Sequence, residues 1–364
     1  VAGALRISPR ETDGQLAFKA DLGGDLRPML PEDLHDFFGV DARLKAQGIR
    51  HADGRMNLDD FSISSRSMTL TGKVSTDTGG APIWAEISAR VADPDGASVL
   101  LPFSEGKTQV TQADIGLKYA APFMAGASQA WSVEGELTNL ETSAGAFGFV
   151  SLSGNGPAPD LETILAGYMK LKAQDVTLND PKLQQALGDT LGFGFDFDAR
   201  KDGQVMLSNL DIQSQDQNIS GTVNLSGMTA GGTPEVKAEV DVRSNDFRPY
   251  SGFAGLPLSG HGSLSLTAAA APLSGTFDAR IDGKTDRLSI GNPRLDPILK
   301  EATTISLSAQ RDMEGVKLKT LTLRNDMADI NGSGVMRNGG GTLSLSGTLS
   351  DTSSLLKGAS GSVK

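Results

Sequence analysis

The stretch "DGQVMLSNLDIQSQDQNISGTV", residues 202–223, sets Leu207, Leu210, Ile212 and Ile219 at fixed distances ahead of Gly221. Residues 53–74, "DGRMNLDDFSISSRSMTLTGKV", and residues 314–335, "EGVKLKTLTLRNDMADINGSGV", keep the same spacing. The matching residues are Leu58, Phe61, Ile63, Leu70 and Gly72 in one copy and Leu318, Leu321, Leu323, Ile330 and Gly332 in the other. Recurrence of one segment within a single chain predicts a repeat architecture.

A longer match of the chain to itself surrounds this segment. Residues 176–203 align without gaps to residues 288–315, at an offset of 112 (288 − 176). A second recurrence, "GDLRPML" at 24–30 and "NDFRPYS" at 245–251, marks the start of a unit. We therefore interpret the chain as four β-groove repeats: residues 1–96, the diverged residues 97–157, residues 158–245 and residues 246–364.

Most of the chain consists of short alternating stretches such as "TISLSA", "VKAEVDV" and "FGFDFDA". Alternation of this kind puts apolar side chains on one face of a strand and polar ones on the other. The dipeptides "DG" and "GG" between these stretches are typical of tight turns, where glycine supplies a positive φ. The sequence predicts a mostly β fold: a long antiparallel or mixed sheet of roughly 20 strands with a single apolar face.

A few short helices are expected between the strands. The candidates are "PEDLHDFFG" (31–39), "PDLETILAGYMKL" (159–171), "DPKLQQALGDTL" (180–191) and "DPILKEAT" (296–303). Each begins with a proline or an acidic residue, which suits a first helical turn. In the second candidate, Leu161, Ile164, Leu165 and Tyr168 follow the i, i+3, i+4, i+7 spacing of an apolar helical stripe. We expect these helices to cap the apolar face of the sheet.

The composition narrows the possible functions. The chain has 33 basic and 44 acidic residues and a net charge of −11, which argues against binding nucleic acid. It contains no cysteine, so disulfides and thiolate sites are excluded. Because no apolar run reaches ~18 residues, no transmembrane helix is expected in this fragment. The first residue is Val1 and not Met, which favours a segment of a longer or processed chain.

The sequence shows no motif typical of an enzyme or a cofactor site. His35, His51 and His261 are far apart and lack a metal-ligand spacing, so we interpret them as exposed loop histidines. Asp196 and Asp198 alternate with phenylalanines and are interpreted as the polar side of a strand. No GxSxG motif accompanies the many serines. No catalytic residue, metal ligand or cofactor is therefore predicted.

The apolar face itself is the feature that requires a function. Either the sheet folds over to seal a dry solenoid core, or it stays open as a groove for aliphatic ligands such as acyl chains. Gln213, Gln215 and Gln217 are expected to face water or form a turn. The candidate groove-lining residues are Leu58, Ile63, Leu70, Phe193, Phe195, Leu207, Leu210, Ile212, Ile219, Val223, Leu225, Ile305, Leu307, Leu318, Leu321, Leu323, Ile330, Leu343 and Leu345.

The order of these motifs resembles a known family. Residues 256–281, "LPLSGHGSLSLTAAAAPLSGTFDARI", followed by residues 286–351, are similar to the TamB/AsmA-like family of bridge-like lipid transfer proteins of Gram-negative bacteria. The similarity is strongest over 160–357 and weakest over 97–157. The resemblance implies a β-taco groove in the periplasm, within an inner-membrane-anchored protein that spans the cell envelope.

The same resemblance implies a function and partners. Members of this family are associated with phospholipid transport between the inner and outer membranes and with assembly of outer-membrane proteins. The expected partners are phospholipids or other acyl-chain lipids, and a TamA-like outer-membrane barrel bound through parts outside this fragment. The alternative is a surface or secreted β-solenoid adhesin with a dry core. Such proteins usually have coils of ~20 to 30 residues and lack interrupting helices.

Overall fold

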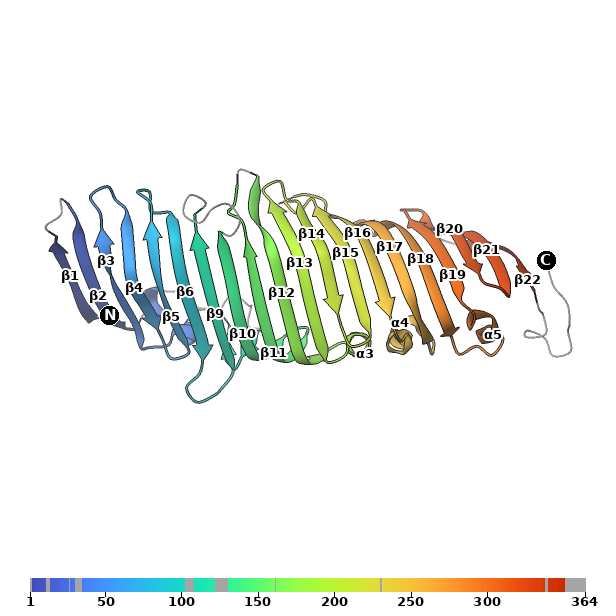
Figure 1. Ribbon diagram of the computed structural model, residues 1–364, viewed down its shortest axis with the longest axis horizontal. Helices are drawn as coiled ribbons and strands as arrows, with labels where there is room; N and C mark the ends of the chain where they lie inside the picture. Colours follow the sequence, from blue (N-terminus) through green and yellow to red (C-terminus); the bar gives the residue numbers. More distant parts are fainter. Residues whose placement is uncertain are drawn as a thin grey trace. The chain divides into compact units, whose positions relative to one another are not determined.

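The computed structural model describes residues 2–10, 14–25, 27–29, 35–101, 108–121, 130–160, 162–229, 231–337 and 340–350. The protein is mostly β, as predicted, with 67% strand and 7% helix. The described strands are assigned to one antiparallel sheet of 22 strands that is not closed (Figure 1). The expected mixed alternative is excluded, because every described pairing is antiparallel.

The chain divides into two compact units, which we describe separately. The first consists of residues 1–160 and 165–179, and the second of residues 161–164 and 180–364. This division does not test the four predicted repeat boundaries, which stay a prediction.

The first unit is built from strands that mostly pair with their neighbours in sequence. The strands are β1 (Ala2–Pro9), β2 (Leu16–Gly24), β3 (Ala42–Arg50), β4 (Met56–Ser64), β5 (Met68–Thr76), β6 (Pro82–Ala92), β7 (Val99–Leu100), β8 (Gln109–Val110), β9 (Gln112–Ala120), β10 (Trp131–Thr142), β11 (Gly145–Gly156) and β12 (Thr163–Leu178). The short strands β7 and β8 pair with each other, and β6 pairs directly with β9. The described helical turns are η1 (Arg27–Met29) and α1 (His35–Phe38).

The second unit follows a simpler order, in which each strand pairs with the next. Its strands are β13 (Thr190–Arg200), β14 (Val205–Gln213), β15 (Gln217–Ser226), β16 (Glu235–Ser244), β17 (Ser259–Ala271), β18 (Thr276–Ser289), β19 (Thr303–Arg311), β20 (Gly315–Arg324), β21 (Ala328–Arg337) and β22 (Gly340–Leu349). Its helical segments are α3 (Pro181–Leu187), η3 (Arg248–Tyr250), α4 (Ser251–Ala254) and α5 (Asp296–Leu299). Figure 1 shows α3, α4 and α5 at the same end of these strands.

The predicted turns have the expected backbone. Gly54 and Gly203, from two "DG" pairs, have φ values of 96° and 83°. In both turns the preceding aspartate accepts a hydrogen bond from the backbone N–H two residues later, at 3.1 Å for Asp53 and 3.0 Å for Asp202. An Asp–Gly pair therefore sets the turn at the start of two of the three repeated segments.

One of the predicted helices is wrong. Residues 163–171 belong to the 16-residue strand β12, which pairs with β11 from Tyr168 to Leu178. The apolar stripe is not buried as a helical stripe would be: Ile164 is 56% exposed and Tyr168 is 37% exposed. Leu165 is also exposed, and Leu161 lies outside the described residues. Pairing with a long neighbouring strand overrides a weak helical periodicity over so few residues.

The other helix predictions agree with the structure where it describes them. The side chain of Asp180 caps α3, accepting a hydrogen bond from the backbone N–H of Lys182 at 2.8 Å, and Pro181 takes the first helical position. Helix α5 lies within the predicted 296–303. Helix α1 lies within 31–39, of which residues 31–34 are outside the described residues. Among the described residues, no helix is both long and apolar enough to cross a membrane.

The repeated segment of the sequence forms the same hairpin three times, as β4–β5, β14–β15 and β20–β21. In each, a β-bulge shifts the register: between Leu58 and Phe61, between Leu207 and Leu210, and between Leu318 and Leu321. A bulge adds one residue to a strand, so two apolar residues three positions apart stay on the same face. The spacing that defines the repeat is therefore the sequence signature of a β-bulge.

The glycine that closes each copy lies directly across from the second bulge residue. Phe61 pairs with Gly72, Leu210 with Gly221 and Leu321 with Gly332. A Cβ added at Gly221 would lie 2.1 Å from the backbone oxygen of Glu239. Glycine is needed here because the next strand passes too close for a side chain.

Candidate functional site

The apolar face of the second unit consists of side chains in continuous rows across the strands. We define it by three rows of paired residues. The first is Phe193, Ile212, Ile219, Val242, Leu264, Gly283, Ile305, Leu323, Ile330 and Gly347. The second is Leu210, Gly221, Val240, Leu266, Ile281, Leu307, Leu321, Gly332 and Leu345, and the third is Leu207, Val223, Ala238, Ala268, Ala279, Ala309, Leu318, Gly334 and Leu343.

Two further candidates of the second unit lie beside these rows. Leu225 pairs with Val205 and Val236 in the adjoining row. Phe195 lies at a register shift of β13, and its ring meets that of Phe197 edge to face with centroids 6.3 Å apart. Together with the rows, this places every candidate of the second unit in the same part of its sheet.

The first unit has an equivalent apolar face. Ile63 and Leu70 belong to the row Leu22, Leu44, Ile63, Leu70, Ala89, Ile115, Gly135, Leu152 and Leu171. Leu58 belongs to the row Leu58, Val74, Ala85, Tyr119 and Trp131. The candidates from the first repeat therefore occupy rows like those of the second unit.

The middle of these rows is not sealed from solvent. Seventeen of the nineteen candidate residues are half-buried, and Leu343 and Leu345 are 63% and 60% exposed. Fully buried aliphatic residues are typical of a close-packed core, where a side chain touches many neighbours. These rows lack that burial, so they favour the open alternative over the dry core.

The buried apolar residues of the second unit gather at the ends of its strands. The strand-end cluster consists of Ala186, Leu191, Phe247, Ile298, Leu299 and Ala328, each no more than 8% exposed. Ala186 lies in α3, and Ile298 and Leu299 lie in α5. Leu191 and Ala328 lie at the starts of β13 and β21, and Phe247 directly precedes η3. The helices therefore cover the strand ends, and η3 and α4 extend over part of the first row, whereas the second and third rows are half-buried or exposed.

Polar side chains fasten these helices to the sheet. Asn325 Nδ2 donates to the backbone oxygen of Ile298 at 2.8 Å and to Thr303 Oγ1 at 2.9 Å. Gln217, expected to face water or form a turn, is instead 6% exposed, and its Nε2 donates to the backbone oxygen of Ala186. That prediction was wrong because Gln217 links the sheet to α3. Gln213 and Gln215 are exposed, as expected.

The recurring "DxRP" sequence also has a structural role at the strand ends. Asp25 accepts hydrogen bonds from the backbone N–H and Nε of Arg27 at 3.0 and 2.9 Å. Asp246 accepts the same pair of bonds from Arg248, at 2.9 and 2.6 Å. The Arg27 guanidinium lowers the pKa of Asp25 to about 2, and Arg248 lowers the pKa of Asp246. Each pair stands at the start of a 3-10 turn.

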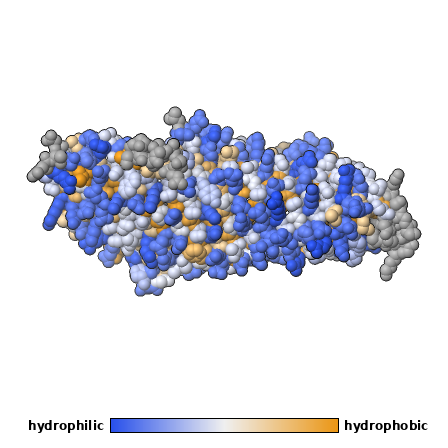
Figure 2. Space-filling model, viewed as in Figure 1, coloured by the Kyte–Doolittle hydropathy of each residue, from blue (hydrophilic) through white to orange (hydrophobic). Residues whose placement is uncertain are grey.

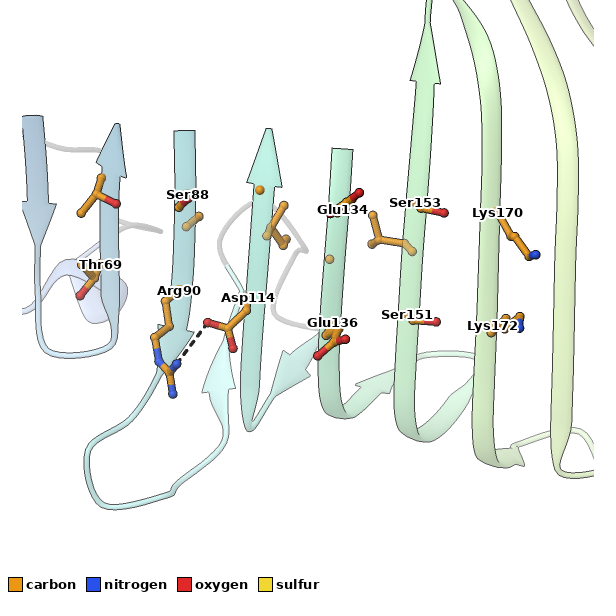
Figure 3. Close-up of a pocket in the computed structure, with 16 residues that line it drawn as sticks. Thr69, Ser88, Arg90, Asp114, Glu134, Glu136, Ser151, Ser153, Lys170 and Lys172 are labelled. Atoms are coloured by element: carbon orange, nitrogen blue, oxygen red, sulfur yellow. Dashed lines mark hydrogen bonds and ion pairs between the residues drawn. The ribbon is translucent and has the colours of Figure 1, made fainter. Parts of the chain in front are cut away.

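The opposite, polar face of the first unit is hollowed over β5, β6 and β9–β12. The hollow has a volume of about 840 Å³ (Figure 3). Arg90 and Asp114 form an ion pair across it at 3.3 Å, and Glu136 and Lys172 lie on the strands beyond. These charges are exposed and of both signs, so the hollow selects no single charged ligand.

Figure 2 shows hydrophilic side chains predominating on one face of the molecule, with hydrophobic residues visible between them.

The histidines and aspartates considered in the sequence do not gather into a metal-ligand cluster among the described residues. His51 Nε2 lies 3.2 Å from Asn57 Nδ2, whereas His261 lies within β17, 3.3 Å from Asp286. The interpretation of His261 as a loop residue was therefore wrong, and His35 lies in α1. Asp196 and Asp198 accept hydrogen bonds from Asn209 and Arg200. Within the described part of the chain, no cluster of three or more metal-ligating side chains occurs.

Comparison of the chain with protein-family models, with curated proteins and with solved structures found no match.

Proposed function

We propose that the apolar face binds the acyl chains of phospholipids and lets them pass along its rows. The observation that supports this proposal is that all nineteen candidate residues are aliphatic or aromatic, yet none is buried. Soluble proteins rarely expose contiguous apolar patches of more than a few hundred Å² unless those patches bind something. An uncovered apolar face across many strands is therefore best explained by an apolar ligand.

The chemistry of the face suits chains that move and not chains that are fixed. Burial of each methylene contributes ~0.8 kcal/mol, so an acyl chain gains affinity from contact alone. Neighbouring positions along a row differ little in chemistry: Ile305, Leu323 and Ile330 follow one another on successive strands. A ligand that shifts by one strand, ~4.8 Å, meets an equivalent surface and no deep energy minimum.

We further propose that the chain is a segment of a TamB/AsmA-like protein of the periplasm. On this proposal it carries phospholipids between the inner and outer membranes and supports assembly of outer-membrane proteins, with a TamA-like barrel engaged by other parts of the protein. The support is the resemblance of residues 160–357, together with the open apolar face. The proposed role is binding and passage, without a chemical step.

Neighbouring residues on opposite faces provide the test. A photo-crosslinking amino acid is placed at Val223, on the apolar face, and at exposed Thr222 as the matched control. The protein is isolated from cells after irradiation, and adducts are identified by mass spectrometry. We expect phospholipid adducts at Val223 at least ~10-fold above those at Thr222, because acyl chains partition to apolar surface. Equal labelling at both positions, or no lipid at either, would contradict the proposal and favour a structural protein such as an adhesin.

A further inference from the structure

Strand β1 is an exposed edge of the first unit. It pairs with β2 over eight consecutive positions, without a bulge, and Figure 1 shows it as an outermost strand of that unit. Every residue of β1 is exposed, Leu5 by 61% and Ile7 by 60%. Edge strands are commonly protected from further pairing by lysines, prolines or bulges. In β1 the one charged residue is Arg6, and Pro9 is the last residue of the strand. The free side of β1 is therefore suited to pairing with another strand.

The sequence of β1 matches the second strand of the repeated hairpin. Residues 2–8, "AGALRIS", align to residues 220–226 of β15, "SGTVNLS", with Gly3 in the place of Gly221. The two strands also pair in the same register with the strand that follows each of them. The equivalent pairs are Gly3–Leu22 and Leu5–Ala20 for β1 with β2, and Gly221–Val240 and Val223–Ala238 for β15 with β16. Strands β1 and β15 therefore have the same place in the repeat.

The equivalence continues into the next strand of each unit. Leu44 and Ala46 of β3 extend these pairs, as Leu266 and Ala268 of β17 do in the second unit. An Asp–Arg turn follows β2 in the first unit and β16 in the second. Strands β1–β3 therefore repeat β15–β17. In the second unit, the strand on the other side of β15 is the bulged strand β14.

Gly3 has the close contact that accompanies a bulged neighbour in other copies. A Cβ added at Gly3 would overlap the backbone oxygen of Asp21 in β2, and one at Gly221 would overlap the corresponding oxygen of Glu239. Gly72 in β5 has an equivalent close contact with the strand that follows it. Gly221 and Gly72 each lie across from the apolar residue that follows a bulge. A bulge increases the local twist, so glycine relieves the close approach of the strand beyond it.

We propose that the free edge of β1 is an interaction surface for one antiparallel β-strand of the bulged class to which β4, β14 and β20 belong. The partner is a polypeptide segment with two apolar residues three positions apart, like Leu207 and Leu210. In the register of β14 with β15, the first of these residues lies across from Leu5 and the second across from Gly3. Backbone hydrogen bonds of such an added strand provide affinity, and its apolar side chains fix the register. The added strand also covers Leu5 and extends the apolar face by one strand.

A second copy of the chain does not offer such a strand at its exposed edge. Strand β22, at the edge of the second unit, pairs with β21 over ten consecutive positions and is not bulged. The bulged strands β4, β14 and β20 already pair with a strand on each side. The occupant of the β1 edge is therefore a separate bulged strand.

The first test measures binding of a synthetic peptide to the purified chain by fluorescence anisotropy. The peptide has the sequence of residues 202–213, which contain β14, and carries a fluorescein label. The control peptide lacks Asn209, so the bulge is lost and Leu207 and Leu210 can no longer face the same side. We expect its Kd to be at least ~10-fold higher, because one apolar contact is lost. Equal Kd values for the two peptides, or no binding of either, would overturn the proposal.

A pair of variants locates the binding site on the chain. Leu5→Asp places a charge under the added strand and should raise the Kd of the peptide at least ~10-fold, because pairing would desolvate the carboxylate. The matched control is Leu273→Asp, in the turn between β17 and β18, where the leucine is 76% exposed. Circular dichroism checks that both variants stay folded, as expected for exposed positions. An unchanged Kd for Leu5→Asp would contradict binding at β1.

A disulfide between peptide and chain reports the register. The chain contains no cysteine, so Leu5→Cys is its single thiol. Residues directly across an antiparallel pair are close enough for a disulfide. A peptide with Leu207→Cys should therefore link to the chain several-fold faster than one with Met206→Cys, which faces the other side. Equal rates, or disulfide-linked dimers of the chain that form in place of the peptide adduct, would overturn the proposal. None of these measurements involves a lipid, so their failure would leave the proposed function standing.

Discussion

The strand-end cluster and the open apolar rows of the second unit contain the same kinds of residue in very different surroundings. Ile298, in the cluster, is 4% exposed, whereas Ile212 in the first row is half-buried. The cluster is covered by short helices fastened by Gln217 and Asn325. Apart from the part of the first row that shares a cavity with η3 and α4, the rows are half-buried or exposed. The same apolar chemistry therefore serves stability at the strand ends and remains available to a ligand in the middle.

This difference indicates how the sheet stays folded with an exposed apolar face. The ladder of backbone hydrogen bonds satisfies the strands themselves, and an uncovered row needs no further partner for its backbone. Packing at the strand ends supplies the burial that the rows lack. Substitutions in the two regions should therefore differ in whether they affect folding or lipid binding.

The largest effect is expected from a charge placed in each region. Ile298→Asp buries an unpaired carboxylate in the strand-end cluster and should lower the free energy of unfolding by about 4 kcal/mol or unfold the unit. Ile212→Asp places the same charge on an open row, where it reaches water, and should cost only about 1 kcal/mol. Urea unfolding followed by circular dichroism measures both values.

Lipid crosslinking on the same two variants sharpens this comparison. Ile212→Asp, or the equivalent Leu323→Asp in another copy, should stay folded and lose most of its lipid adducts. Similar losses of stability in Ile298→Asp and Ile212→Asp would show that the rows are sealed in solution, and would revive the dry-core alternative.

A smaller effect is expected at the glycine across from the bulge. Gly221 has a φ of 155°, and its missing Cβ would lie 2.1 Å from the backbone oxygen of Glu239. Gly221→Ala should lower the free energy of unfolding by about 2 to 3 kcal/mol, because the clash is with backbone that cannot move aside. Gly340→Ala is the control: a Cβ there meets nothing within 4 Å, and the change should stay within about 0.5 kcal/mol. Equal unfolding midpoints for the two variants would refute the role of the bulge in fixing the rows.

The sequence predicted the rows well because strand alternation is a local signal. Leu207, Leu210 and Ile212 were assigned to one face from spacing alone, and all three lie on apolar rows. The bulge itself was not predicted, although an offset of three between Leu207 and Leu210 breaks strict alternation and was its signal. A departure from period two that recurs in every copy is best interpreted as a bulge.

The features that sequence reasoning missed depend on pairing across the sheet. Residues 163–171 belong to β12, whose pairing with β11 from Tyr168 onward is not revealed by their own periodicity. Gln217 is buried because α3 folds back onto it, and Thr285 lines a cavity because residues 247–258 cross above it. Each outcome is decided by contacts between residues more than ten positions apart, and a single sequence carries no direct signal for these.

The smallest expected effect is a loss of stability at acidic pH. It involves the ion pairs Asp25–Arg27 in the first unit and Asp246–Arg248 in the second. Arg27 lowers the pKa of Asp25 to about 2 in the folded state, from 3.8 in a free side chain. A depressed folded-state pKa contributes stability that is fully present above about pH 4 and is lost as the pH falls through about 2. Asp25→Asn removes this contribution, so its stability deficit relative to the wild type should be constant from pH 7 to 5 and should shrink between pH 4 and 2. Urea midpoints across this range measure the deficit, and Asp246→Asn should behave in the same direction in the second unit, because Arg248 lowers the pKa of Asp246. A deficit that stays constant down to pH 2 would mean that the Asp–Arg pairs are not formed in solution, and that packing alone holds the strand ends.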